Sequence, residues 1–264
     1  KHSDLEWTVK LPGETEYVKT QTMPFDLTKD IEYNKKNIGK YKAGPDEECP
    51  DVKNPIAGFA AMIEHLDNQV GELLDLLHAE GIEENTLVLF CSDNGAHREG
   101  GHSPEFWNST GPLKGIKRDL YEGGIRVPLI ARWPGKIKAG TTSSTPVVSM
   151  DFYPTFLEVA GLKLGNKPID GKSIMPLLRQ SGKLKRKAIY FHYPNYAWHM
   201  DNRLGGAVRS GSWKLIRNYD DDSLELYDMS EDLSEKNNLA VQRPKIAARL
   251  NRGLSQWLKE TNAP

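Results

Sequence analysis

The sequence of 264 residues is poor in cysteine, in long apolar runs and in net charge. Its 2 cysteines are too few for a disulfide framework, so the fold must rest on a packed core. No apolar run approaches the roughly 18 residues that a membrane-spanning helix requires, so we expect no membrane span in this sequence. A formal net charge of −1 argues against a broad basic surface for nucleic acid.

The N-terminal residues also lack a targeting signal. Lys1-His-Ser-Asp-Leu-Glu contains no apolar stretch of the kind found in a secretory signal peptide. This absence bears on export only if the natural chain begins at this point. The remaining composition, 38% hydrophobic and 27% charged, permits one or two globular domains with a substantial core.

The most informative segment present is an apolar strand that ends on two oxygen-bearing side chains. Residues 86–92 are rich in β-branched and aromatic side chains, which predicts a buried strand, and Cys91 is expected to be a small core residue within it. The strand is followed by Asp93-Asn94-Gly95. A carboxylate and an amide carbonyl are ligands suited to Ca²⁺ or Mg²⁺. Asn-Gly is also a strong hairpin signal, so a plain turn is the competing interpretation.

The surrounding sequence argues against a hairpin at this turn. Residues 96–104 are polar and glycine-rich, which predicts a loop and not a second strand. Upstream, Asn54-Pro55 predicts a helix start and Gly81 a helix end, with apolar residues recurring on one face between them. A long helix followed by an apolar strand is typical of a βαβ unit in a parallel sheet. Ligands bind at the carboxyl ends of such strands.

A cationic loop follows about twenty residues later. Lys114-Gly-Ile-Lys117-Arg118 places three cationic side chains close together in sequence. Fixed cations beside metal ligands predict a site for an anionic substrate. Within the loop, Lys114 and Arg118 are expected to play a structural role.

Several blocks, in this order, resemble the second half of the type I sulfatase (arylsulfatase) family. The central blocks are Ser92-Asp-Asn-Gly95, Gly111-Pro-Leu-Lys-Gly-Ile-Lys117 and Tyr121-Glu-Gly-Gly-Ile-Arg-Val-Pro-Leu-Ile-Ala-Arg-Trp-Pro-Gly135. The similarity continues to Leu224-Glu-Leu-Tyr-Asp228 near the C-terminus. The resemblance implies an α/β fold, with an alkaline-phosphatase-like mixed sheet flanked by helices and a small C-terminal antiparallel sheet with one helix.

The resemblance also implies roles for individual residues. Asp93 and Asn94 match the family's second pair of metal ligands, which bind Ca²⁺ or, alternatively, Mg²⁺. Lys117 matches the lysine that contacts sulfate and stabilises charge on the leaving oxygen. His2 lies in a segment that only loosely resembles the one carrying a substrate-contacting histidine, because Asp4 stands where proline is usual.

One family feature has no counterpart in this sequence. The family's nucleophile is a formylglycine made from Cys or Ser within a Cys/Ser-x-Pro-x-Arg motif, and neither Cys49 nor Cys91 lies in one. Ser144-Thr-Pro-Val-Val148 comes nearest but ends in valine. We therefore expect the nucleophile, and the first pair of metal-binding aspartates, in an N-terminal half that would partner this chain. Without that half we expect no sulfatase activity and weak metal binding.

The sequence predicts two domains. Residues 1–182 would form the C-terminal portion of the catalytic α/β domain, with residues 1–53 mostly irregular and further strands at residues 127–131 and 146–150. Residues 183–264 would form a subdomain with short strands at residues 188–193, 206–209, 213–216 and 223–227, a turn at 220–223 and a closing helix at 244–260. Asp151 would cap a helix that ends at Gly161.

Four more residues are candidates for contacting substrate. His97 and His102 follow the metal ligands in the loop, although a loop-bracing role suits them equally. Trp198 and Arg203 lie in an aromatic and cationic segment between two predicted strands, where loops often carry binding residues.

The function expected is cleavage of a sulfate ester, on a small molecule or carbohydrate, to an alcohol and inorganic sulfate. Two alternatives remain: a phosphate-ester hydrolase of the alkaline-phosphatase-like superfamily, and a non-catalytic binding fragment. The compartment is unknown from the sequence, although the resemblance implies an exported protein.

Overall fold

The computed structural model describes residues 7–10, 16–19, 55–98, 102–166, 168–195 and 204–263, with side chains from residue 57 onward. The chain forms two compact units. The first unit comprises Lys1–Gly71, Asn94–Arg126 and Tyr190–Pro264, and the second comprises Glu72–Asp93 and Val127–Ile189. The predicted boundary at residue 182 stays a prediction.

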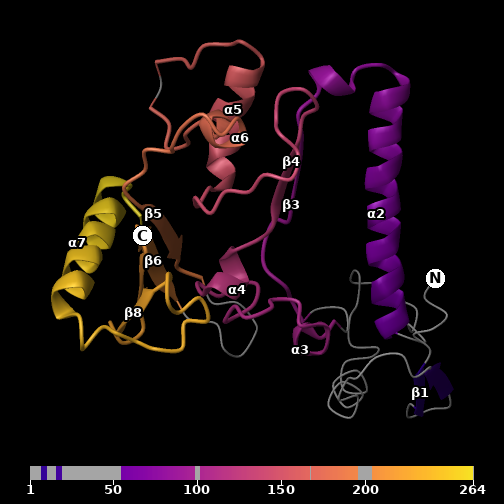
Figure 1. Cartoon of the computed structure of the whole chain (residues 1–264). Coiled ribbons are helices and arrows are strands. Elements are labelled where there is room, and N and C mark those ends of the chain that lie inside the picture. The colour runs from indigo at the N-terminus through magenta and orange to yellow at the C-terminus, as the bar shows by residue number, and fades with distance from the viewer. Residues whose placement is uncertain are drawn as a thin grey trace. The chain divides into compact units, whose positions relative to one another are not determined.

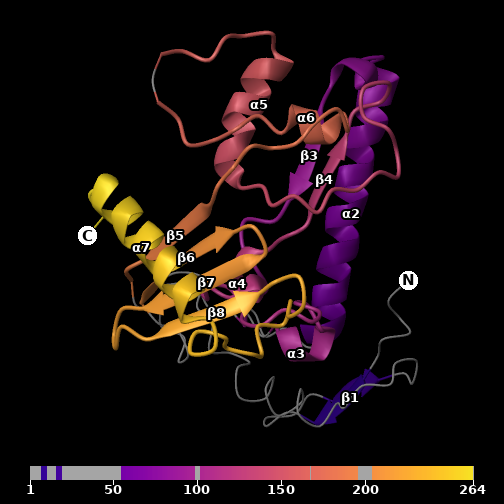
Figure 2. The same ribbon diagram turned by 60° about the vertical axis from the view of Figure 1, so that its left-hand side comes forward.

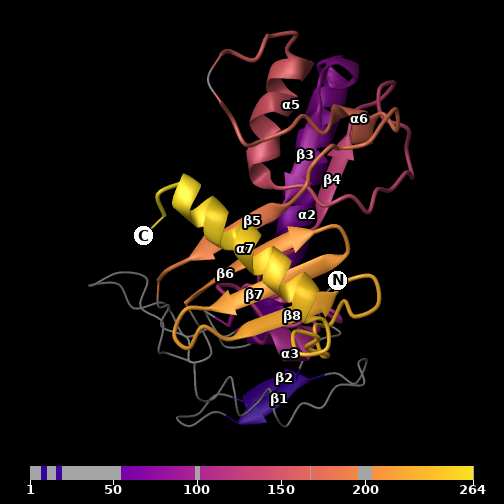
Figure 3. The same ribbon diagram turned by 90° about the vertical axis from the view of Figure 1, so that its left-hand side faces the viewer.

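A four-stranded sheet dominates the first unit (Figure 3). Its strands lie in the order β5-β6-β7-β8 and are β5 (Ile189–Tyr193), β6 (Gly205–Ser210), β7 (Trp213–Asn218) and β8 (Leu224–Asp228). Strands β6, β7 and β8 pair antiparallel, with Val208 opposite Leu215 and Leu215 opposite Leu226. The four short strands predicted from the sequence are therefore confirmed, together with the turn before β8, where Asp222 has a φ of 55°.

Helix α7 (Pro244–Glu260) packs on one face of this sheet (Figures 1 and 3). Proline at its first position fixes a helical φ where no backbone donor is needed, and the predicted bounds are confirmed. The helix buries Ala247, Leu250 and Leu254, and Leu254 is fully buried. Burying a leucine side chain contributes about 1.5–3 kcal/mol, so this layer stabilises the sheet substantially.

The sheet also buries a second set of side chains. The cluster contains Ala207, Ile216, Tyr227 and Met229, with Leu120, Tyr121, Phe191 and Leu233 packed against it. Leu120 and Tyr121 come from the segment that follows the cationic loop. The C-terminal sheet is therefore packed against the chain that carries the candidate site.

The second unit contains an antiparallel pair of strands, β3 (Val88–Cys91) and β4 (Leu129–Arg132), visible in Figure 2. Phe90 lies opposite Ile130. The sequence predicted both strands, but it placed β3 in a parallel sheet. Within the ranges that the structure describes, the partner of β3 is antiparallel.

Helix α2 (Pro55–Ala79) precedes β3, as the apolar periodicity predicted. Gly81 follows with a φ of 65°, a conformation that glycine adopts without steric penalty, so the predicted stop is confirmed. Helix η2 (Glu83–Asn85) connects α2 to β3. Among the described residues, no helix is sufficiently long and apolar to span a bilayer.

A buried carboxylate organises the region around α5 (Phe152–Val159). Asp151 is fully buried, pairs with Arg186, and accepts hydrogen bonds from the backbone N–H groups of Val148 (3.0 Å) and Lys172 (2.8 Å). It precedes α5 as predicted, but its side chain holds these neighbouring segments and does not cap the helix. Residues 146–150 were predicted to be a strand and are not; Asp151 instead closes η4 (Ser149–Asp151) there.

The remaining elements are short. Strands β1 (Trp7–Lys10) and β2 (Glu16–Lys19) pair antiparallel within a region that was expected to be mostly irregular. The three other short helices are α3 (Pro104–Trp107), α4 (Glu122–Ile125) and α6 (Met175–Leu178).

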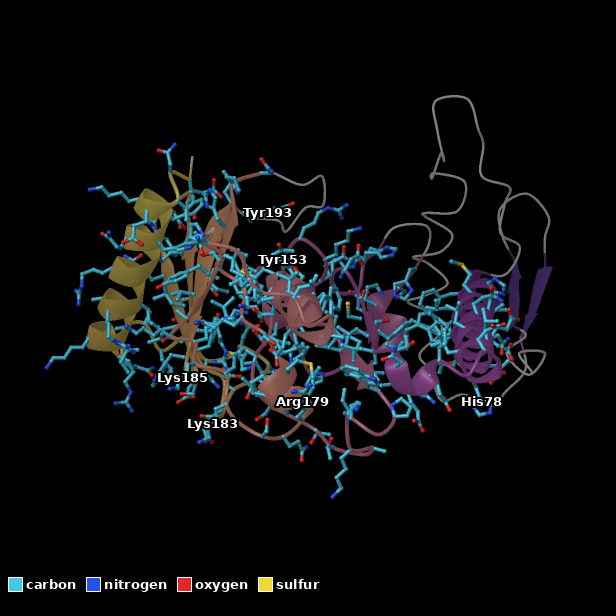
Figure 4. The ribbon with its side chains drawn as sticks, turned by 90° about the horizontal axis from the view of Figure 1, so that it is seen from above. His78, Tyr153, Arg179, Lys183, Lys185 and Tyr193 are labelled. Atoms are coloured by element: carbon cyan, nitrogen blue, oxygen red, sulfur yellow. The ribbon has the colours of Figure 1, made fainter. Side chains whose placement is uncertain are left out.

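Large apolar side chains are exposed on several elements of the second unit. Ile130 is 60% exposed on β4, and Tyr153, labelled in Figure 4, is 59% exposed on α5. Phe90 on β3 is also exposed. Cys91 is exposed as well, so the prediction that it lies in the core was wrong for this chain, because the described residues do not cover that end of the strand.

Candidate functional site

The two predicted metal ligands lie just beyond the end of β3. Asp93 is exposed and Asn94 is half-buried. The Asn94 side-chain nitrogen donates to the carbonyl oxygen of Gly95 at 3.1 Å. The chain then continues through residues 96–98 without forming a strand, so the hairpin interpretation of Asn94-Gly95 is excluded.

The chemistry of these ligands fits a hard divalent cation, but the set is incomplete. Asp93 and Asn94 offer a carboxylate and an amide oxygen, both suited to Ca²⁺ or Mg²⁺. Ca²⁺ takes about 6–8 oxygen ligands. In the part of the chain that the structure describes, there is no cluster of three or more His, Cys, Asp or Glu side chains arranged to hold a metal. Further ligands would have to come from elsewhere.

Close backbone packing joins the Asn94 segment to the segment around α4. The Gly95 N–H donates to the Gly124 carbonyl at 2.9 Å. A Cβ at Gly95 would lie 1.8 Å from the Gly123 oxygen, and one at Gly123 would lie 2.1 Å from the Gly115 oxygen. Side chains cannot occupy these positions, so glycine is required for the approach. We call Gly95, Gly115, Gly123 and Gly124 the glycine node.

The same backbone network positions Lys117. The N–H of the half-buried Lys117 donates to the carbonyl oxygen of Ala96 at 2.7 Å, and Ala96 lies two residues beyond Asn94. The loop closes on itself because the Asp119 carboxylate accepts the Ile116 N–H at 2.7 Å. The structure therefore brings the backbone of Lys117 to the segment that begins at Asn94, although 23 positions separate the two residues in the printed sequence.

Lys114 has the structural role that the sequence predicted. Its ammonium lies 3.8 Å from the centre of the Tyr121 ring and 3.8 Å from a carboxylate oxygen of Glu225. The Tyr121 hydroxyl donates to the same carboxylate, at 2.8 Å to Oε2. Burial by itself would raise the pKa of Glu225, but hydrogen bonds from Tyr227, Tyr121 and Asn218 outweigh it and lower the pKa. This carboxylate is therefore ionised and holds Lys114 against the sheet.

A buried ion cluster joins the same segment to the C-terminal sheet. Lys214 Nζ lies 2.9 Å from Glu122 Oε1 and 2.8 Å from Glu235 Oε1. Lys214 and Glu235 are both 1% exposed. Burial raises the pKa of Glu235, against the opposing effect of the Lys214 charge. We call Glu122, Lys214 and Glu235 the ion cluster.

The sequence analysis did not identify the ion cluster. The available signal was the alternation along β7, which places Lys214 on the same side as Ile216 and Asn218, all three buried. A lysine at a core-facing strand position needs a buried carboxylate partner. Nothing in the local sequence identified Glu235 as one, since it lies in a loop.

The two histidines of the intervening loop lie near each other, with ring centroids 5.8 Å apart. His102 is buried, its ring centroid lies 4.2 Å from that of Phe59, and its Nε2 lies 3.1 Å from Ser109 Oγ. Burial, and secondly the charge of His97, lowers the pKa of His102 to about 4. These contacts favour loop bracing for His102, while substrate contact by either histidine stays a prediction.

Three predicted site residues lie outside the described residues. They are His2, Trp198 and Arg203, and their roles stay predictions. His65 and His78 are exposed on α2. His78, labelled in Figure 4, lies 2.9 Å from a carboxylate oxygen of Glu83.

Two family models match the chain. Residues 18–162 match the sulfatase family, and residues 116–263 match the C-terminal region of N-sulphoglucosamine sulphohydrolase. Each match covers more than half of the sequence. Together they extend from before α2 to the end of α7.

Individual relatives agree with this match. A sulfatase of Formosa agariphila is 36% identical over 256 residues, which cover 85% of this chain and 43% of the relative. An N-acetylglucosamine-6-O-sulfatase of Bacteroides thetaiotaomicron is 38% identical over 208 residues, which cover 77% of this chain and 35% of the relative.

A solved structure extends the likeness to three dimensions. Its protein, in complex with its substrate D-glucosamine-2-N,6-O-disulfate, is 34% identical with a TM-score of 0.63, and the match covers 76% of this chain and 40% of that one. The chain therefore spans less than half the length of each of these relatives. With two family models and these relatives in agreement, the chain belongs to the sulfatase family.

Proposed function

We propose that this chain is the C-terminal part of a sulfuric ester hydrolase, which cleaves a sulfate ester with water to give an alcohol and inorganic sulfate. The observation that carries the proposal is the backbone network at the end of β3. It holds Lys117 beside the segment that carries Asn94, through the Lys117–Ala96 and Gly95–Gly124 hydrogen bonds. An oxygen ligand and a cation on adjoining segments suit a tetrahedral anion.

The residues divide the chemistry between them. The Asp93 carboxylate and the Asn94 amide oxygen would hold Ca²⁺ or, alternatively, Mg²⁺. The cation, when bound, neutralises sulfate charge and orients the reacting groups. The Lys117 ammonium would bind a sulfate oxygen and stabilise the charge that develops on the leaving oxygen.

The substrate class proposed is a sulfated carbohydrate. Two relatives support it: one is named an N-acetylglucosamine-6-O-sulfatase, and one binds D-glucosamine-2-N,6-O-disulfate as its substrate. The site elements of this chain recognise the sulfate group, and the sugar would be selected by loops around it.

We further propose that the catalytic domain is completed by an N-terminal half of the same protein. The relatives are more than twice as long as the matched region, and the described residues contain no group of three or more His, Cys, Asp or Glu side chains that could hold a metal. The exposed apolar side chains of β3, β4 and α5 are consistent with a surface that such a half would cover. The formylglycine nucleophile would come from that half.

The test compares this chain with the complete gene product that carries it. We expect the complete product to release inorganic sulfate from a 6-O-sulfated N-acetylglucosamine, and this chain to release none. Lys117→Met and Asn94→Ala in the complete product should each lower kcat/KM by at least about 100-fold, since each removes a group that acts in the transition state. Asp67→Asn, an exposed change on α2, is the matched control and should leave kinetics unchanged.

The outcomes separate the alternatives. Hydrolysis of the matching phosphate ester with no sulfate release would favour a phosphate-ester hydrolase. Sugar binding without hydrolysis of either ester would favour a binding protein. Sulfate release by this chain alone would overturn the proposal that a second half supplies the nucleophile.

A further inference from the structure

We propose that the ion cluster of Glu122, Lys214 and Glu235 holds the Lys117 loop and the Asn94 segment in position, so that the C-terminal sheet positions the sulfate-binding groups. This inference rests on the proposed function of Lys117 and Asn94. It assigns Lys214 and Glu235 a positioning role, because they act through backbone segments and are not placed at the substrate.

The anchor of the cluster lies in the middle of the sheet. Lys214 belongs to β7, which pairs with β6 on one side and β8 on the other, so its backbone is held on both edges. Its side chain is almost fully buried on the side of the sheet that contains Ile216. A lysine held in this way presents its ammonium at a fixed point.

Glu122 is the point at which the cluster contacts the site segment, and it is held twice. Its carboxylate pairs with Lys214 at 2.9 Å, and its backbone N–H donates to Glu235 Oε2 at 2.7 Å. Glu122 is the first residue of α4, so the Glu235 carboxylate receives a backbone donor that has no partner within the helix. Both contacts reach across 92 or more positions of sequence.

The glycine node connects Glu122 to the Lys117 loop and to the Asn94 segment. Directly after Glu122, the Gly123 N–H donates to the Lys114 carbonyl at 2.7 Å, at the start of the Lys117 loop. The Gly124 carbonyl accepts the Gly95 N–H, next to Asn94. Because a Cβ at Gly123 would overlap the Gly115 backbone, the segments touch directly and have no room to slide.

The charges in the ion cluster oppose displacement of α4. Two carboxylates at one buried position repel each other unless a cation lies between them, and Lys214 contacts both. Arg126 lies 3.5 Å from the second oxygen of Glu122 and adds positive charge on the exposed side. Any displacement of α4 separates charges that have already lost their water, which is costly.

Glu122→Gln is the sharpest test, because it preserves shape and leaves Lys214 paired with Glu235. In this chain, amide hydrogen exchange at Gly95, Lys117 and Gly123 should accelerate at least about tenfold, while amides in α7 such as that of Leu254 stay within about threefold. Glu231→Gln, an exposed glutamate in the loop that carries Glu235, is the matched control and should change neither group of amides.

In the complete gene product, Glu122→Gln should lower kcat about tenfold with KM within about threefold, because small displacements of reacting groups affect the transition state most. Unchanged exchange at Gly95 and Lys117 would overturn the inference. Equal acceleration in α7 would also overturn it, since it would indicate general loss of stability. Absence of sulfatase activity in the unsubstituted product would instead overturn the proposed function, and the exchange result would stand separately.

Discussion

The C-terminal sheet and the β3–β4 pair use apolar residues in opposite ways. In the sheet, Leu215 and Leu226 are fully buried between layers that this chain supplies. On the β3–β4 pair, Phe90 and Ile130 lie opposite each other and both are exposed. Similar strand sequences thus reach different degrees of burial within one chain.

The two regions differ in whether the described residues of this chain complete the hydrophobic core. The sheet has α7 and the Leu120–Tyr121 segment as packing partners, and even its buried charges are paired. The β3–β4 pair follows the same apolar pattern, but the described residues do not cover those side chains. Contiguous exposed apolar groups are typical of a surface that another segment covers.

The largest effect is expected at the ion cluster. Lys214→Met removes the only cation that contacts both buried carboxylates in the described structure, and breaking a buried ion pair on one side costs about 3–5 kcal/mol. The free energy of unfolding of this chain, measured by urea titration, should fall by that amount. Lys236→Met, an exposed change, is the control and should alter it by less than about 0.5 kcal/mol. A loss below 1 kcal/mol for Lys214→Met, on the order of an ordinary surface change, would contradict the burial described.

A pair of alanine substitutions tests the comparison directly. Leu215→Ala should lower the free energy of unfolding by about 2–5 kcal/mol, because it opens a cavity in a closed core. Ile130→Ala should cost less than about 1 kcal/mol in this chain, because its side chain is already in water. In the complete gene product, the Ile130→Ala cost should rise toward that of Leu215→Ala. Equal costs for Ile130→Ala in both proteins would mean that nothing covers β4.

The burial of His102 predicts a pH dependence of stability. In the folded chain its pKa is about 4, while an unfolded histidine titrates near pH 6.5. Between these values the unfolded state binds the extra proton. Stability is therefore full above about pH 6.5 and falls as pH drops toward 4, by on the order of 3 kcal/mol.

Urea titrations at several pH values measure this effect. In the His102→Gln chain, the free energy of unfolding should vary less with pH between about 4 and 6.5. His65→Gln, at an exposed position on α2, is the control and should leave the profile unchanged. If the free energy of unfolding falls as steeply with pH in the His102→Gln chain, another group causes the pH dependence.

The smallest effect is expected within α2. A Cβ at Gly71 would meet nothing within 4 Å, so Gly71→Ala should stabilise the chain by about 1 kcal/mol through helix propensity. Thermal unfolding followed by circular dichroism measures the shift. Destabilisation would indicate that α2 is interrupted at this position, where the two units meet in the sequence.

Local sequence patterns predicted most of the secondary structure. The bounds of α7, the stop at Gly81 and the turn before β8 follow from periodicity, proline and glycine, which act over a few residues. The prediction failed at residues 146–150, where apolar and β-branched residues favoured a strand. There the buried Asp151 carboxylate binds the Val148 N–H and closes a helical turn.

The candidate site was predictable only in part. Asp93, Asn94 and Lys117 were predicted from their motifs, and their roles stay predictions. The backbone hydrogen bonds place Lys117 next to the segment that follows Asn94, around the glycine node. The direction of the partner strand of β3 was not predictable, because an apolar strand pairs in either direction. The exposure of Cys91 was also unforeseen, since burial depends on which segments lie above the strand.

The sequence by itself determined most of the elements and the family, because helix and strand periods, turn residues and ordered motifs each depend on short stretches of chain. Only the tertiary structure decided which charges share a buried position. Glu122 lies 92 positions from Lys214 and 113 from Glu235, so their local sequences do not show that these residues meet. The free energy of a buried charge is set by the neighbours that surround it in space, and those neighbours are known only once the chain has folded.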